Sequence, residues 1–293
     1  MRSGKFRVKN SVWHGHEKGE KSMYNVKVKN YGNGQVQTRI YSHLIYTGDK
    51  EKPEQQDFEI SPFDGCKVKE VQDFDEFEKE EQRRLQISLK RAKGKIYDYS
   101  RANEWDWFVT LTFNPEKVNR YDYSACTKKL SDWLSNMRRG AGETFRYIVV
   151  PERHKDGAFH FHGLFCNCDS LGIEFSGHFT KDGEKIYNIG KYKLGWTTAT
   201  KVKINDAATK YITKYTTKDL MEHIKGKKKY WVSRNLNLPQ ETTFFVDRGE
   251  MVGLHNELTE DGCLYYKNVF YEIGTVPHSV RYYEHKVEGG EEE

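Results

Sequence analysis

Two histidines at alternate positions, His160 and His162, are the first residues whose types and spacing indicate chemistry. Successive side chains of an extended strand point to opposite faces, so residues two apart leave the same face and can share one metal ion. The segment Lys155–Gly157 predicts a hairpin loop, and the resulting pairing puts Glu152 opposite His160. Two imidazoles and a carboxylate with open positions suit a catalytic divalent cation, either Mn²⁺ or Mg²⁺, although Zn²⁺ stays open.

A second group combines phenols with cations. In the segment YITKYTTK, Tyr211, Lys214, Tyr215 and Lys218 stand at positions i, i+3, i+4 and i+7, so on one helix they would form a single polar stripe. A tyrosine becomes a nucleophile toward phosphorus when a cation stabilises its phenolate and a metal polarises the phosphate. Together with the histidines, this stripe predicts an enzyme that cuts a phosphodiester bond by tyrosine attack.

These two groups need a sheet and a helix to position them. The apolar patterns predict a long amphipathic helix, a strand, a second helix, a β-hairpin, another strand and a third helix. In chain order these elements are Asp73–Ile96, Trp107–Phe113, a helix from Tyr123, the hairpin Arg146–His154 with Ala158–Phe165, Gly195–Ile204, and Ala207–Met221 capped by Asn205 or Asp206. This order indicates an α+β domain in which helices pack on one face of an antiparallel sheet.

The chain divides into three predicted regions. Residues 1–70 form a β-rich N-terminal region, in which Asn33-Gly34 is a turn signal, and residues 71–240 form a nuclease domain that includes the leading helix. Residues 241–293 form a β-rich extension with an acidic tail. The charged segment Lys50–Asp64, with two prolines, is typical of a connector.

Composition bounds the class of protein. A chain of 293 residues can bury a core without disulfides, and its five cysteines are an odd number that we expect to be free thiols. No apolar stretch approaches the roughly 20 residues that span a membrane, so we expect a cytoplasmic protein in a bacterial host. The net charge of +5 allows a polyanionic partner without requiring one.

Three ordered segments resemble the motifs of HUH endonucleases, the replication initiators of rolling-circle plasmids and small single-stranded DNA phages. They are Phe108–Phe113 (FVTLTF), Phe159–Leu164 (FHFHGL) and Tyr211–Lys218 (YITKYTTK), and the similarity covers roughly Lys95–Pro239. The resemblance implies a central antiparallel sheet that carries the metal, and a cut at a DNA origin that leaves a 5′-phosphotyrosine link and a free 3′-hydroxyl. It also implies single-stranded or extruded origin DNA as substrate, and a host helicase and polymerase as partners.

The two tyrosines distinguish subtypes of this family. Initiators similar to the A protein of small icosahedral phages carry two tyrosines four residues apart, as here. The resemblance implies that Tyr215 makes the first nick and Tyr211 attacks in the closing strand transfer, although the roles could alternate or reverse. Lys214 and Lys218 would then support the phenolates.

Other interpretations stay open. A relaxase or a transposase of the same superfamily would use the same chemistry on different DNA, whereas a non-catalytic zinc- and DNA-binding regulator would use His and Cys without paired tyrosines. His154 is a further candidate ligand, and Cys166 with Cys168 would complete a zinc site if they are not core thiols. The basic run Gly226–Tyr230, with Arg234 and the basic side of the leading helix, either holds DNA phosphates or is a solvated surface. No segment matches a Walker A motif, which argues against an attached helicase domain.

Overall fold

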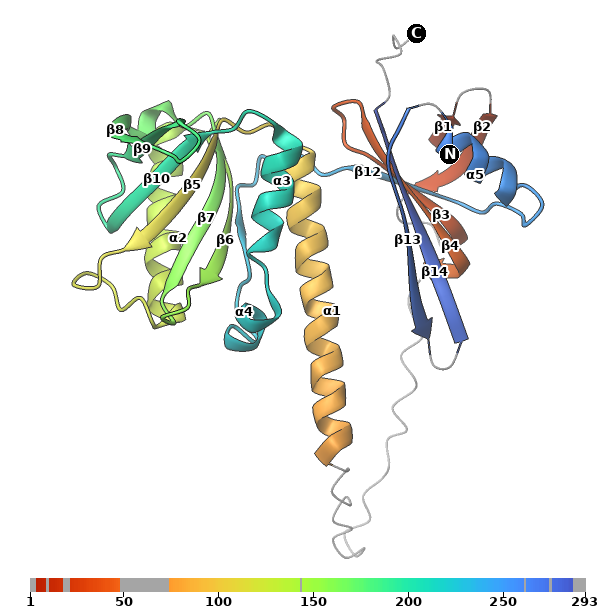
Figure 1. Cartoon of the computed structure of the whole chain (residues 1–293), viewed down its shortest axis with the longest axis horizontal. Helices are drawn as coiled ribbons and strands as arrows, with labels where there is room; N and C mark the ends of the chain where they lie inside the picture. Colours follow the sequence, from red (N-terminus) through yellow and green to blue (C-terminus); the bar gives the residue numbers. More distant parts are fainter. Residues whose placement is uncertain are drawn as a thin grey trace, which may run out of the picture. The chain divides into compact units, whose positions relative to one another are not determined.

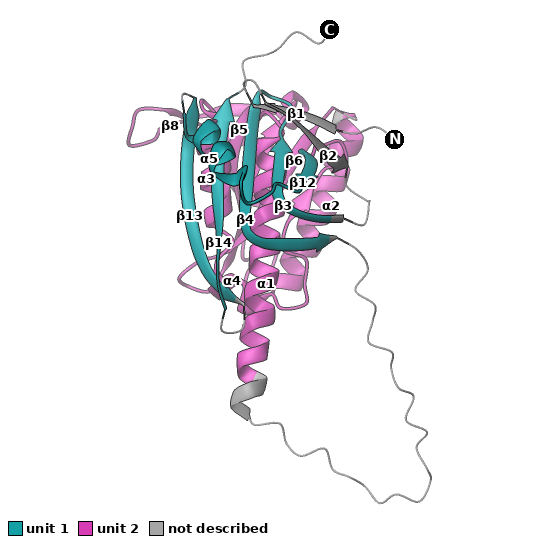
Figure 2. Cartoon of the chain, turned by 90° about the vertical axis from the view of Figure 1, so that its right-hand side faces the viewer, with its two compact units in different colours: residues 1–67, 239–293 teal, residues 68–238 magenta. Residues whose placement is uncertain are grey.

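The computed structural model describes residues 4–8, 11–17, 22–47, 74–142, 144–260, 262–273 and 276–286. The chain divides into two compact units (Figure 2): unit 1 consists of residues 1–67 and 239–293, and unit 2 of residues 68–238. Each unit contains its own seven-stranded sheet, and every pairing in both is antiparallel. The predicted α+β class is confirmed. In the part of the chain that the structure describes, no helix is both long and apolar enough to cross a membrane.

The sheet of unit 2 has the strand order β11-β6-β7-β5-β10-β9-β8. Its strands are β5 (Trp107–Phe113), β6 (Arg146–Arg153), β7 (Phe159–Cys166), β8 (Ile173–Phe179), β9 (Lys185–Ile189), β10 (Gly195–Lys201) and β11 (Trp231–Val232). The predicted strand at Trp107–Phe113, the hairpin and the strand beginning at Gly195 are confirmed. The β8–β9 hairpin and the short β11 were not predicted.

Helices cover both faces of this sheet, so the prediction that they pack on one face is wrong (Figure 1). Helix α2 (Tyr123–Ala141) packs on one face, and α1 (Phe74–Arg101) and α3 (Asn205–Lys214) contribute to a separate core on the other. The reason lies in β6, where the consecutive residues Ile148, Val149 and Val150 are all fully buried. A strand that is apolar on both faces needs a covering layer on each side.

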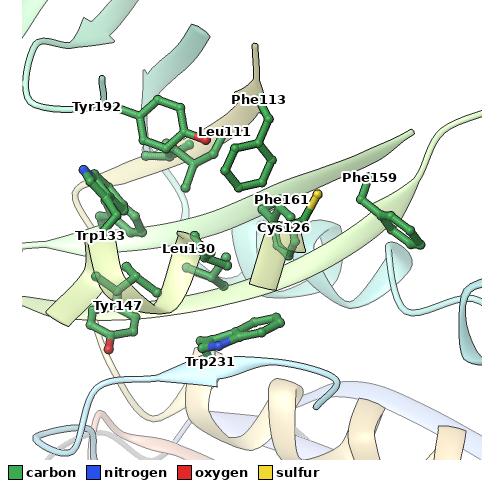
Figure 3. Packing of buried hydrophobic residues seen from close by; sticks show 14 of the residues in the cluster. Leu111, Phe113, Cys126, Leu130, Trp133, Tyr147, Phe159, Phe161, Tyr192 and Trp231 are labelled. Atoms are coloured by element: carbon green, nitrogen blue, oxygen red, sulfur yellow. The ribbon is translucent and has the colours of Figure 1, made fainter. Parts of the chain in front are cut away.

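The core on the α2 side is built from large rings (Figure 3). Leu111 and Phe113 of β5 and Phe161 of β7 meet Leu130 and Trp133 of α2. Helix α2 begins cleanly because the Asp122 carboxylate accepts hydrogen bonds from the Ser124 and Ala125 amides. This apolar side fixes the strands whose other side carries the polar motif residues.

The third predicted helix is interrupted. Instead of running through Ala207–Met221, α3 ends at Lys214, and a short α4 covers Lys218–His223. The break comes from Thr217, whose extended backbone and side-chain oxygen cap α4 by accepting the Leu220 amide at 3.2 Å. The predicted cap at Asn205 or Asp206 is also wrong, since Ile204 holds the cap position of α3 without a side-chain bond.

Unit 1 is a sheet in which strands from both ends of the chain alternate. Its order is β1-β2-β12-β3-β4-β14-β13. The elements are β1 (Gly4–Val8), β2 (Ser11–Glu17), β3 (Ser22–Asn30), β4 (Gln35–Thr47), β12 (Gln240–Phe244), α5 (Met251–Thr259), β13 (Cys263–Ile273) and β14 (Val276–Lys286). Helix α5 packs Leu254 and Leu258 against one sheet face, around the fully buried Tyr283. The β-rich character predicted for residues 23–48 and 241–286 is confirmed, and α5 was not predicted; the connector at Lys50–Asp64 and the acidic tail lie outside the described residues.

Candidate active site

The histidine pair lies on the central strand of unit 2. β7 pairs with β5 on one side and with β6 on the other. His160 stands between Thr112 and Glu152, and His162 stands one step further along the same face. The predicted hairpin register is confirmed: the His154 amide donates to the Ala158 carbonyl at 2.8 Å, and Glu152 lies opposite His160.

Two threonines of β5 orient both imidazoles. Thr110 Oγ1 lies 3.1 Å from His162 Nδ1, and Thr112 Oγ1 lies 3.1 Å from His160 Nδ1. With Nδ1 occupied in each ring, Nε2 is the nitrogen available to a cation. Sequence reasoning missed these threonines, although the alternation Thr-x-Thr puts them on one strand face as surely as His-x-His does for the histidines.

Glu152 is joined to His162. Its Oε2 atom lies 2.6 Å from His162 Nε2, and the His162 side chain is buried. This hydrogen bond, more than the nearby imidazole charges, lowers the pKa of the Glu152 carboxyl below its usual range. Burial and then the adjacent His154 lower the pKa of His160, so the neutral, ligand-competent imidazole is favoured there.

The described residues contain no group of three or more His, Cys, Asp or Glu side chains already gathered around one point. Glu152 is engaged with His162, while the His160 ring lies 5.1 Å from the exposed His154 ring. His154 also faces Asp156, with Nδ1 3.4 Å from the carboxylate. The donor chemistry of Glu152, His160 and His162 fits a divalent cation, but the three side chains are not pre-assembled.

Tyr215 lies directly on this group. Its ring stacks on the His162 ring with a centroid separation of 3.6 Å and an interplanar angle of 14°. It stands at the C-terminal end of α3, half-buried, where the helix stops. Burial first, and then Tyr211 and Glu152, raise the pKa of the Tyr215 hydroxyl, so a phenolate there needs a compensating positive charge.

Tyr211 is the second phenol of the group. Its ring meets the Tyr215 ring edge to face at 5.4 Å, and Lys214 Nζ lies 5.4 Å from the centre of the Tyr211 ring. Phe108 of β5 contacts both tyrosines, at 5.1 and 6.3 Å between ring centres, and stacks near His162 at 5.9 Å. The structure therefore brings Tyr211, Lys214 and Tyr215 together with the histidines, and adds Phe108 as a contact that the motif comparison alone did not reveal.

Lys218 is not part of this group. Because the helix breaks at Thr217, Lys218 begins α4, where its ammonium group donates to Gln82 of α1 at 3.1 Å and lies 3.7 Å from Glu222. The predicted single stripe of two tyrosines and two lysines is wrong at its last position.

The cysteines and the basic run also have definite places. Cys166 and Cys168 are both buried and belong to cores on opposite faces of the sheet, as expected for core thiols rather than a paired zinc site. In the basic run, Lys227 donates to Ser124, and Lys228 lies over the Trp231 ring at 5.3 Å. Both lysines are exposed beside α2, a position that leaves a role in DNA contact open.

The fold and this site define an antiparallel α+β domain with a His-x-His strand facing a tyrosine-bearing helix. Residues 106–220 match a family model described as replication-associated protein ORF2, and this stretch lies wholly within unit 2. The match spans all three motif segments and supports a replication initiator family, with a role in DNA replication. Neither the curated proteins nor the solved structures include a match to this chain.

Proposed function

We propose that the chain is a metal-dependent DNA-nicking and strand-transfer enzyme of the HUH type, which initiates rolling-circle replication. The observation that carries the proposal is the convergence of all three motifs on one point. Tyr215 stacks on His162, and His162 lies between Thr110 and Glu152. A core-only role would not require a phenol, an imidazole and a carboxylate in mutual contact, because burying such groups is costly unless each is satisfied.

In the proposed nick, the Tyr215 phenolic oxygen attacks the scissile phosphorus after its proton leaves to solvent. The bond from phosphorus to the 3′ oxygen breaks, and that oxygen takes up a proton to give a free 3′-hydroxyl. The 5′ phosphate remains joined to Tyr215. Tyr211, one helical turn away, then attacks in the closing transfer, with Lys214 beside it.

His160 and His162, through Nε2, and Glu152 would hold a divalent cation, Mn²⁺ or Mg²⁺, after Glu152 or His160 reorients. When bound, such a cation polarises a phosphate oxygen and offsets the negative charge that builds up during attack. Thr110 and Thr112 keep both imidazoles turned for this task, and their hydroxyls can either donate or accept a proton at Nδ1.

The proposed substrate is single-stranded or locally extruded origin DNA. In a relaxed duplex, the scissile phosphate is hard to bring between a sheet face and a helix end. A host helicase would open the duplex and a host polymerase would extend the 3′-hydroxyl. Relaxases and transposases of the same superfamily share the chemistry and differ in the DNA that they recognise.

The test is denaturing electrophoresis after incubation with labelled DNA and Mn²⁺. A band at the summed mass of protein and oligonucleotide is expected with single-stranded DNA. The band should be absent with EDTA and much weaker with a relaxed linear duplex. Equal cleavage of both strands of a linear duplex, or undiminished cleavage in EDTA, would contradict the proposal.

A further inference from the structure

The outermost strand of the unit 1 sheet is long and apolar on both of its faces. β13 (Cys263–Ile273) ends the strand order, and within the described part of the chain it pairs with β14 only. Tyr266 and Phe270 share the face that carries Tyr283 and α5, whereas Tyr265 lies on the opposite face. The exposed fractions are 46% for Tyr266, 76% for Phe270 and 45% for Tyr265.

Exposure on both faces limits what can cover this strand. A molecule lying on one sheet face would leave the rings of the other face in water. A strand added in the plane of the sheet would use the outer backbone groups of β13 and would bring side chains next to both faces at once. We propose that β13 pairs antiparallel with β13 of a second copy of this chain, making one continuous sheet across a two-fold axis.

Two-fold symmetry restricts the register of this pairing. Opposite residues must lie on the same face, so the axis passes through a residue. Centring it on Asn268 sets Tyr265 opposite Tyr271 of the partner subunit and Tyr266 opposite Phe270 of the partner subunit. Aromatic rings directly opposite each other are among the favourable cross-strand pairs. This register therefore covers the exposed rings on both faces.

Asn268 provides an independent observation for this centre. Its side-chain oxygen is buried and is without a hydrogen-bond donor among the described residues. Buried polar atoms are ordinarily satisfied, and Asn268 of the partner subunit would lie directly opposite and bring an amide donor.

The charges of the strand permit self-association. Between Cys263 and Ile273 it carries one cation, Lys267, and one anion, Glu272, so two identical edges meet without net repulsion. In the register centred on Asn268, neither charged residue faces its own copy. An edge built to resist pairing would carry several like charges or a proline.

The proposal does not depend on the nicking chemistry, and it is tested on the full chain by sedimentation velocity over a range of concentrations. The wild-type protein should form a dimer. Tyr265→Lys on one face and Phe270→Lys on the other should each weaken the dimer by about tenfold or more, because the symmetry counts every substitution twice. The matched control is Val252→Lys, which changes a residue of α5 that is 66% exposed in the same unit, and it should leave the dimer intact.

Cross-linking defines the register and covers the case in which a lysine variant fails to fold. Asn268→Cys should form a disulfide-linked dimer under mild oxidation, because the two residues face each other. Cys263 of the wild-type protein should not, since about 10 residues of strand, roughly 33 Å, separate the two copies of it. A wild-type protein that stays monomeric at every concentration would overturn the proposal, as would a dimer unaffected by either lysine, a dimer sensitive on one face only, or no Asn268→Cys cross-link.

Discussion

The two faces of the unit 2 sheet are made by the same strands and do different work. Along β7, Phe161 points into the core under α2 and is fully buried, and the next residue, His162, points to the opposite face and contacts Thr110, Glu152 and Tyr215. The α2 face is built from interlocking rings (Figure 3). One face supplies the stability that allows the other to gather polar groups, so substitutions of adjacent residues should separate folding from chemistry.

The largest expected effect is on the polar face. His160→Ala combined with His162→Ala should lower nicking by about 10²–10³-fold or more, because both proposed nitrogen ligands are removed. His162 is only 6% exposed, contrary to the sequence-based expectation that neither histidine is part of the interior, so thermal unfolding must accompany the assay. Retained cleavage in the folded double variant would remove the metal assignment. Glu152→Ala should be milder if two imidazoles still hold the ion.

The second effect is on the apolar face. Phe161→Ala should lower the free energy of unfolding by about 3–5 kcal/mol, because a fully buried ring leaves a cavity under α2. Urea denaturation measures the loss, and the nicking rate per folded molecule should change little. If instead the folded variant loses its nicking while its stability is unchanged, the proposed division of labour between the two faces is wrong.

A smaller effect concerns the threonines that orient the histidines. Thr110→Val or Thr112→Val keeps the side-chain shape and removes one hydroxyl, so affinity for Mn²⁺ should fall by about 10–100-fold while the fold is retained. Titration calorimetry measures this. Thr198→Val is the matched control, since Thr198 is the exposed residue opposite Thr110 on β10. Equal losses in all three variants would show that the threonines do not act through the imidazoles.

The smallest effect is on thiol reactivity. Burial raises the pKa of Cys126 and of Cys168 to about 12, so almost none of the reactive thiolate exists at pH 8. Both thiols should resist iodoacetamide in the folded protein and react after unfolding in guanidinium, as read by peptide mass spectrometry. The partly exposed Cys263 should react first. Rapid labelling of Cys126 in the native protein would mean that the core under α2 opens readily.

The site was largely predictable because short-range periodicity decides it. Alternation along a strand places His160 and His162 on one face, and a three-residue loop ending in glycine sets Glu152 opposite His160; both predictions match the observed register. The threonine contacts follow from the same alternation once β5 is known to lie beside β7, which depends on pairing between segments about 50 residues apart.

The failures have equally local or equally distant causes. The helix was drawn through Thr217 because its apolar spacing continues, yet Thr217 followed by Asp219 is itself a helix-start signal that outweighs the spacing. The two covered faces of the sheet were missed since a buried strand and a half-buried one differ in tertiary packing more than in local pattern. The assembly of unit 1 from both ends of the chain leaves no trace in local periodicity, because β12 and β14 find β3 and β4 only after the chain has completed unit 2.

The central claim is that Tyr215 is the nucleophile of the first nick, and the most direct measurement is the covalent adduct formed by tyrosine variants with single-stranded origin DNA and Mn²⁺. Tyr215→Phe keeps the ring over His162 and removes the hydroxyl, so the adduct should disappear. Tyr211→Phe should still form it, with the phosphotyrosine mapped by mass spectrometry to Tyr215, but should fail to release a joined strand. An adduct that persists in Tyr215→Phe and is lost in Tyr211→Phe would reverse the roles, and an adduct in the variant lacking both hydroxyls would contradict the account.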